Sequence, residues 1–210
     1  KSSEPSKPVT AQHVADLARI KARLTETLVP DLPLPLEAVP DSVAKSMESL
    51  GEDGSWADVD YADRARATWA PTRHLDRIAG MAIAWMRIPG TPANEAVRKP
   101  LKDGVDRALA FWFKRDPQSD NWWHNKIGPQ LLLQRIGLAL DPVLTAEQRS
   151  NIVRLLARGK TDGMTGGNLV WTAGATVVRG VLDGRADVAA RAFELIADEV
   201  HIAPDEDEGV

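Results

Sequence analysis

The sequence contains 210 residues, of which 43% are hydrophobic, so it is long enough to form a domain of ordinary size around a substantial core. Its 26 basic and 30 acidic residues give a net charge of −4, which excludes the strongly basic surface typical of nucleic-acid-binding proteins. Cysteine is absent, which excludes disulfides and thiolate metal sites.

The first nine residues are polar and proline-containing, and they lack the apolar core of a signal peptide. We therefore predict a flexible N-terminal segment at 1–9, followed by a domain from residue 10 to residue 210. No window of the sequence approaches the roughly 18 to 20 apolar residues that a membrane span requires, so we expect no membrane partner.

Apolar side chains recur at spacings of three and four from Thr10 to Leu28, which predicts an amphipathic helix. The proline-rich stretch 30–40 ends that helix. A second apolar stripe, from Leu75 to Met86, predicts another helix.

Local signals mark the ends of later helices. Thr91-Pro92 supplies an N-cap and a proline for the first helical turn. Thr145 and Gln148 form a capping-box pattern that opens a helix through Leu156. Asp183-Gly184 ends the helix that follows, and a further apolar stripe runs over 188–196.

The fold class indicated by these stripes is all-α. They predict about eight or nine helices joined by short turns, and no stretch alternates with the period of two expected of strands. Because no repeat of fixed period is present, antiparallel helical hairpins arranged as an incomplete (α/α) toroid fit best. The acidic run 204–210 contains no helix stop or core residue, so we expect the chain to end inside this domain.

Large aromatic and amide side chains cluster in the segment 121–129, between two helical stripes. Trp122 and Trp123 cannot share one helix face, because neighbouring side chains point about 100° apart. An exposed indole can stack on the apolar face of a sugar while Asn121 and Asn125 bond its hydroxyl groups. The alternative is that both tryptophans are wedges between helices.

A second cluster, Gly163-Met-Thr-Gly-Gly-Asn168, precedes an apolar helical run from Leu169 to Leu182. Its glycines allow a ligand to approach the backbone closely. An asparagine just before a helix is most often the N-cap of that helix. The functional alternative is that Asn168 directs a neutral amide at a carboxylate.

The pattern Asn-Trp-Trp-x-x-x-Ile-Gly at 121–128, followed by Thr-Gly-x-Asn at 165–168, resembles polysaccharide lyase family 8. That family includes hyaluronate, chondroitin and xanthan lyases. The segments 53–61 and 69–77 also resemble its N-terminal helical region, so the resemblance extends from about residue 10 to the end. Two departures concern substrate choice more than fold: the run 124–126 replaces acidic and aromatic residues, and Gly167 stands where alanine is common.

The resemblance implies a secreted lyase, extracellular or periplasmic, that degrades a uronic-acid polysaccharide such as a glycosaminoglycan by β-elimination. It implies that Asn168 neutralises the substrate carboxylate and that Trp122 and Trp123 form an aromatic patch for carbohydrate binding. Asn121 lies in the same cleft, and we expect His124 and Asn125 to contact substrate as well. No metal and no organic cofactor are expected. The expected partners are the acidic polysaccharide and the remainder of the same protein.

The catalytic tyrosine, histidine and arginine that the resemblance implies match no residue of this sequence. Tyr61, the single tyrosine, is expected to have a packing or surface role. His74 and His124 are conceivable bases, although a lone histidine such as His124 in a polar loop is more often merely solvated. The other two histidines are expected at the surface. We therefore expect the rest of the toroid, and β-sandwich domains, outside this chain, which should be inactive alone.

Two other readings stay open. An α/α-toroid glycoside hydrolase would use paired carboxylates, for instance Asp58 or Asp60 with a second acid. A noncatalytic carbohydrate-binding helical module would use the tryptophans for recognition or packing only.

Overall fold

A computed structural model describes residues 10–29 and 39–201 of the chain. All regular elements in these two ranges are helices, so the all-α prediction is confirmed. The α-helices are α1 (Ala11–Leu28), α2 (Asp41–Glu48), α3 (Thr72–Arg87), α4 (Glu95–Arg115), α5 (Trp122–Lys126), α6 (Gly128–Leu140), α7 (Ala146–Leu156), α8 (Gly166–Leu182) and α9 (Ala186–Glu199). Two short 3₁₀ helices, η1 (Pro92–Asn94) and η2 (Asp141–Val143), join α3 to α4 and α6 to α7.

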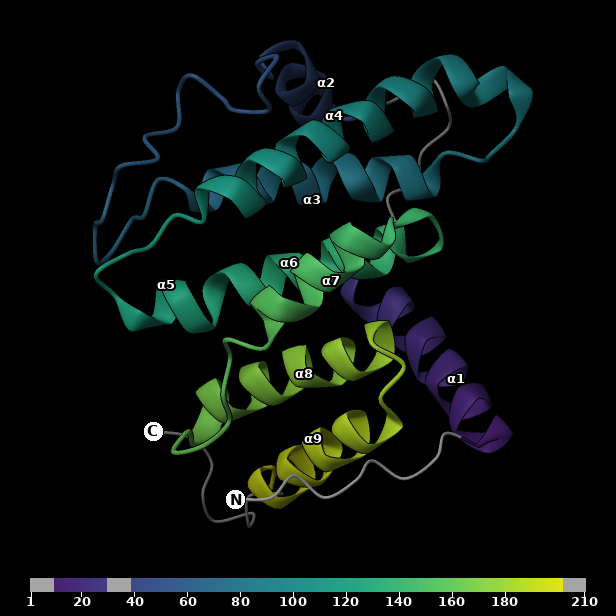
Figure 1. The fold of residues 1–210 in the computed structure, drawn as a ribbon, viewed down its shortest axis with the longest axis vertical. Coiled ribbons are helices and arrows are strands. Elements are labelled where there is room, and N and C mark those ends of the chain that lie inside the picture. Colours follow the sequence, from purple (N-terminus) through teal and green to yellow (C-terminus); the bar gives the residue numbers. More distant parts are fainter. Residues whose placement is uncertain (1–9, 30–38, 202–210) are drawn as a thin grey trace, which may run out of the picture.

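The helices form stacked layers of hairpins (Figure 1). Helix α3 of the α3–α4 hairpin packs on α6. Helices α6 and α7 form the middle layer, and α8 and α9 form the hairpin at the other end. Helix α1 crosses these layers and contacts α6, α8 and α9. The predicted hairpins are therefore present. The predicted segment 1–9 and the acidic run 204–210 lie outside the described residues.

Several helix ends follow from local capping chemistry. Thr10 begins α1 with a capping box in which its hydroxyl accepts a hydrogen bond from the backbone N–H of His13. Thr145 and Gln148 form the predicted capping box of α7, with bonds of 3.0 and 3.1 Å. Gly184, with φ of +68°, follows the end of α8 in the left-handed conformation that glycine adopts without strain. The predicted capping box of α7 and the predicted end of α8 at Asp183-Gly184 are confirmed.

The core follows the apolar stripes. On α3 the fully buried side chains Leu75, Ile78 and Met81 lie on one face, with the spacing of three that the sequence shows. Helix α6 is buried almost all round, because it lies among α1, α3, α7 and α8. This central helix begins directly after α5, so the aromatic segment is held at the edge of the core. No helix of the two described ranges is long and apolar enough to cross a membrane.

Candidate functional site

Helix α5 carries the tryptophan segment and is capped by Asn121. The Oδ1 atom of Asn121 accepts a hydrogen bond of 3.0 Å from the backbone N–H of Trp123, and its Nδ2 donates one of 2.7 Å to the carbonyl of Arg66. A helix of five residues has little stability of its own, so these bonds fix its start and its direction. The amide of Asn121 thus orients the tryptophans.

Asn125 is also engaged within the protein. Its Oδ1 accepts from the backbone N–H of Ser119 at 2.9 Å, and its Nδ2 donates to the carbonyl of the same residue at 2.8 Å. The hydroxyl of Ser119 in turn donates to the carbonyl of Ala65 at 2.7 Å. The connection before α3 is thereby held against α5, and both amides that the sequence offered as sugar ligands have positioning roles.

The two adjacent tryptophans have different surroundings, as their spacing predicts. Trp122 is 45% exposed, whereas Trp123 is only partly exposed. A methyl group added at Gly128 would lie 2.5 Å from Cζ3 of Trp123, so the indole rests directly on the first turn of α6. Trp123 is therefore partly a wedge, and Trp122 is the open platform.

His124 belongs to α5 and is enclosed rather than solvated. Its Nε2 donates a hydrogen bond of 2.7 Å to the carbonyl of Ala67, and its ring contacts those of Trp69 and Trp123 at centroid distances of 5.7 and 5.3 Å. Its Nδ1 is buried without a hydrogen bond among the described residues. The reading of a merely solvated side chain is therefore wrong, because packing against two indoles covers the ring.

Asn168 is the third residue of α8, not its cap. The N-cap position belongs to Thr165, whose side chain makes no capping bond. Asn168 is partly exposed, and no hydrogen bond to its side-chain amide is found among the described residues. The N-cap alternative is wrong because α8 begins three residues earlier than the sequence suggests. The amide remains available to a ligand.

The two sequence motifs meet through Trp171, which sequence reasoning missed. Its ring lies 6.4 Å from that of Trp123 at an interplanar angle of 83°, an edge-to-face contact. Trp171 follows Asn168 by three residues on α8, so both lie on neighbouring positions of one face. Helix α5 and the first turn of α8 lie at the same end of the layers in Figure 1. In the sequence, the spacing of three residues between Asn168 and Trp171 was the signal that could have identified Trp171 as part of this surface.

Tyr61, which is partly buried, forms a hydrogen-bonded pair with the fully buried His74. The Tyr61 hydroxyl donates to Nδ1 of His74 at 2.8 Å, and Nε2 of the histidine donates to the carbonyl of Ala108 at 2.9 Å. Burial lowers the pKa of His74 to about 4, and burial raises the pKa of Tyr61. Phe111 and Trp112 stack on the imidazole. The packing role of Tyr61 is confirmed, and His74 is fully buried and unsuited to be a base.

Asp58, one candidate acid of the hydrolase reading, is paired with cations. Both of its oxygens accept hydrogen bonds from Arg77, at 2.7 and 2.6 Å. The Arg77 hydrogen bond lowers the pKa of Asp58. A general acid needs the opposite shift. Asp60 accepts a bond from the backbone N–H of Ala62 and is exposed.

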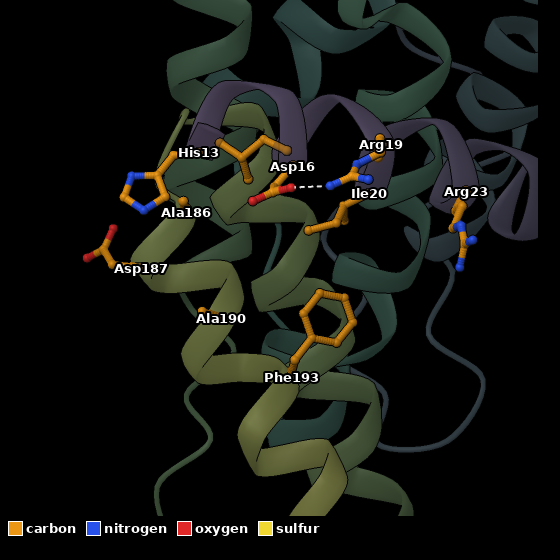
Figure 2. Close-up of a pocket in the computed structure, with 10 residues that line it drawn as sticks. His13, Asp16, Arg19, Ile20, Arg23, Ala186, Asp187, Ala190 and Phe193 are labelled. Carbon is orange, nitrogen blue, oxygen red and sulfur yellow. Dashed lines mark hydrogen bonds and ion pairs between the residues drawn. The ribbon is translucent and has the colours of Figure 1, made fainter. Parts of the chain in front are cut away.

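A cavity lies elsewhere, between α1 and α9 (Figure 2). Its volume is about 660 Å³, and Leu17, Ile20 and Phe193 line it. Its charged residues are mixed in sign, and Arg19 is paired with Asp16 at 2.5 Å. None of the predicted site residues lines it. Across residues 10–29 and 39–201, no group of three or more His, Asp or Glu side chains is arranged to hold a metal ion.

Comparison with known proteins gives a consistent result. Residues 23–209 match the family described as polysaccharide lyase family 8, N terminal alpha-helical domain. The chain is 31% identical over 145 residues to chondroitinase-AC of Pedobacter heparinus, which covers 66% of this chain and 20% of the relative. It is 29% identical over 148 residues to hyaluronate lyase of Thermasporomyces composti, which covers 68% of this chain and 18% of the relative.

The fold also matches that of a solved structure. A chondroitinase AC lyase, studied as enzyme–oligosaccharide complexes, superposes with a TM-score of 0.77 at 24% identity, over 89% of this chain and 27% of that one. This likeness establishes the fold as that of the α/α toroid. The chain spans about a fifth of the length of the curated relatives it matches.

Proposed function

The chain belongs to polysaccharide lyase family 8, and from this premise we propose that the whole protein cleaves a uronic-acid-containing polysaccharide by β-elimination. The relatives named chondroitinase-AC and hyaluronate lyase support this reaction class. We further propose that the protein is secreted, acts without metal or organic cofactor, and binds its polymer at the surface formed by α5 and the start of α8.

The chemical difficulty of this reaction is the proton on C5 of the uronate. A base removes that proton, its electron pair forms the C4–C5 double bond, and the C4–oxygen bond breaks while an acid protonates the departing oxygen. Negative charge builds up on the adjacent carboxylate in the transition state, so a fixed donor aimed at that group accelerates the reaction.

The observation that carries the proposal is the free amide of Asn168. It is partly exposed, has no hydrogen-bond partner among the described residues, and occupies the first turn of a helix of 17 residues. Gly166, the first residue of this helix, donates its backbone N–H to the carboxylate of Glu199, so the helix end is already paired and the amide of Asn168 is the free donor there. Asn168 can therefore donate a hydrogen bond to the substrate carboxylate without first breaking one.

The tryptophans position the polymer. Trp122 offers an exposed indole face for a sugar ring, and the partly exposed Trp123 rests on Gly128 at the start of α6. Three polar side chains support the tryptophans indirectly, because their hydrogen bonds to the backbone hold α5 in place: those of Asn121, His124 and Asn125.

The acid and the base are proposed to come from the remainder of the protein, on the same or a separate chain. His74 is fully buried, and its pKa of about 4 makes it a poor acceptor of a C5 proton at neutral pH. Tyr61 donates to His74 and accepts a bond from the backbone N–H of Trp56 at 3.0 Å. Neither side chain is free to act at the surface formed by α5 and the start of α8.

The test is chemical. The whole protein is incubated with hyaluronan, chondroitin sulfates, xanthan and polymannuronate, and the ultraviolet absorbance of an unsaturated uronate is recorded. A lyase produces that chromophore with at least one polymer. Cleavage products without a double bond would favour a glycoside hydrolase instead, and binding without cleavage would favour a noncatalytic module.

A further inference from the structure

The seven tryptophans of the chain separate into two groups. Trp56, Trp69 and Trp112 are buried in the core, and Trp85 lies under the guanidinium of Arg98, 4.3 Å from its ring centre. The remaining three are Trp122, Trp123 and Trp171, and the first and last of these are 45% and 46% exposed. Trp122 precedes Trp123 in the chain, and the ring of Trp171 contacts that of Trp123.

Two glycines lie near Trp171 on α8, one on each side along the helix. Gly167 precedes Trp171 by four residues, and a methyl group placed there would lie 3.9 Å from Cη2 of the indole. The ring therefore leans toward the N-terminus of the helix, as long side chains on helices do. Gly174, one turn later, has open space on its outer side. Glycine on both sides leaves the indole uncovered.

Trp171 lies on the same face of α8 as Asn168, the residue proposed to bind the substrate carboxylate. Asn168 precedes it by three residues, which corresponds to about 4.5 Å along the helix axis. Because the indole leans toward the N-terminus, its ring lies beside the turn of α8 that carries Asn168. The edge-to-face contact with Trp123 holds the indole from the side opposite the solvent.

We propose that Trp171 is a third sugar-stacking residue, which binds the ring next to the uronate held by Asn168. The inference rests on the proposed function, because it places Trp171 on the same bound polymer. In this proposal α8 contributes two side chains to substrate binding. Trp171 stacks on one sugar ring, and the amide of Asn168 binds the carboxylate of the adjacent uronate.

The experiment measures binding of uronic-acid hexasaccharides to the whole protein by calorimetry, for the unaltered protein and for Trp171→Ala, Trp171→Phe and Trp171→Leu. We expect Trp171→Ala to weaken binding about tenfold and Trp171→Phe to retain most of it. Leucine fills the space beside Trp123 but offers no aromatic face. If the role were only packing, Trp171→Leu would restore binding, and that result would overturn the proposal.

A matched control is Phe193→Ala on α9, which removes a 42% exposed aromatic ring at the other cavity and should leave binding unchanged. Hexasaccharides with their carboxyl groups reduced to alcohols separate the two roles on α8. With that ligand the loss in Trp171→Ala should persist, whereas the effect of Asn168→Ala should disappear.

The two proposals fail in different ways. Binding that is lost in Trp122→Ala and unchanged in Trp171→Ala would overturn the role of Trp171 and leave the proposed function intact. If the whole protein bound no uronic-acid oligosaccharide, both proposals would be wrong.

Discussion

Asn168 and His74 are both polar side chains on helices, but their environments give them opposite properties. The amide of Asn168 is partly exposed and unbonded, so it can serve a ligand. The imidazole of His74 is fully buried, with each nitrogen in a hydrogen bond, so it serves the fold. The neighbouring groups decide whether each side chain is bonded and whether it is exposed. These two properties set the expected effect of each substitution.

Replacing Asn168 should affect turnover more than binding. We expect Asn168→Ala to lower kcat by about 100-fold or more, because one preorganised donor to a developing anion is lost. Asn168→Asp should be worse, since two carboxylates would then repel. Steady-state kinetics of the whole protein measure both, with Asn151→Ala on the surface of α7 as control. A change confined to KM would contradict the role in the transition state.

His74 should make stability depend on pH. Its folded pKa of about 4 lies below the ordinary value of 6.5, so the unfolded chain binds a proton first as the pH falls. The stabilisation is fully present above about pH 6.5 and is lost as the pH falls toward about 4. Between about pH 7 and about pH 5 we expect a loss of about 2 kcal/mol in unfolding free energy.

Urea unfolding at both pH values measures this loss. His74→Gln removes the titrating group and should flatten the pH dependence, whereas His201→Gln at the exposed end of α9 should not. An equal pH dependence in the unaltered protein and in His74→Gln would show that other groups are responsible.

At the scale of elements, the sequence was informative where the chemistry is local. Thr10, Thr145 and Gly184 mark helix ends because a cap acts within four residues. The contacts that build the site are not local. Nothing near Asn121 indicates that its amide binds Arg66, and the partner of Trp123 lies on α8. Family resemblance located the motifs, and only the fold showed which of their atoms remain free.

Helix α5 should depend on its cap. Asn121→Ala removes the bonds to Trp123 and Arg66, and we expect a loss of about 1 kcal/mol in stability with weaker oligosaccharide binding. Thr145→Ala removes the equivalent cap of α7 and is the matched control. It should lose similar stability and keep its affinity, as measured by unfolding and calorimetry. Equal affinity in both variants would argue against a positioning role for Asn121.

At the scale of the whole molecule, one carboxylate ties distant parts together. Asp141, at the start of η2, binds Lys21 of α1 at 2.7 Å and Arg149 of α7 at 2.5 Å. Arg149 also donates to the carbonyl of Leu182 at the end of α8. Burial raises the pKa of Asp141, but the bonds to Lys21 and Arg149 outweigh it and the pKa is lowered overall. This network joins α1 to the α6–α8 layers.

Neutralising that carboxylate should loosen the layers. We expect Asp141→Asn to cost about 2 kcal/mol of unfolding free energy, because two partly buried cations lose their partner. Asp16→Asn breaks the exposed pair with Arg19 and should cost much less than Asp141→Asn, because solvent screens that pair. Chemical denaturation compares the two variants. Similar small losses in both would show that the layers hold together by apolar contact alone.

The contact between Trp123 and Trp171 has an optical consequence. Two indoles with centroids 6.4 Å apart lie close enough for their electronic transitions to couple, and coupled transitions produce a paired band of opposite signs in circular dichroism. Trp69 and Trp112 form a second such pair in the core, at 6.3 Å. The difference spectrum between the unaltered chain and Trp171→Phe isolates the surface pair. The chain thus contains its own spectroscopic reporter of whether α5 and α8 remain in contact when a polymer binds.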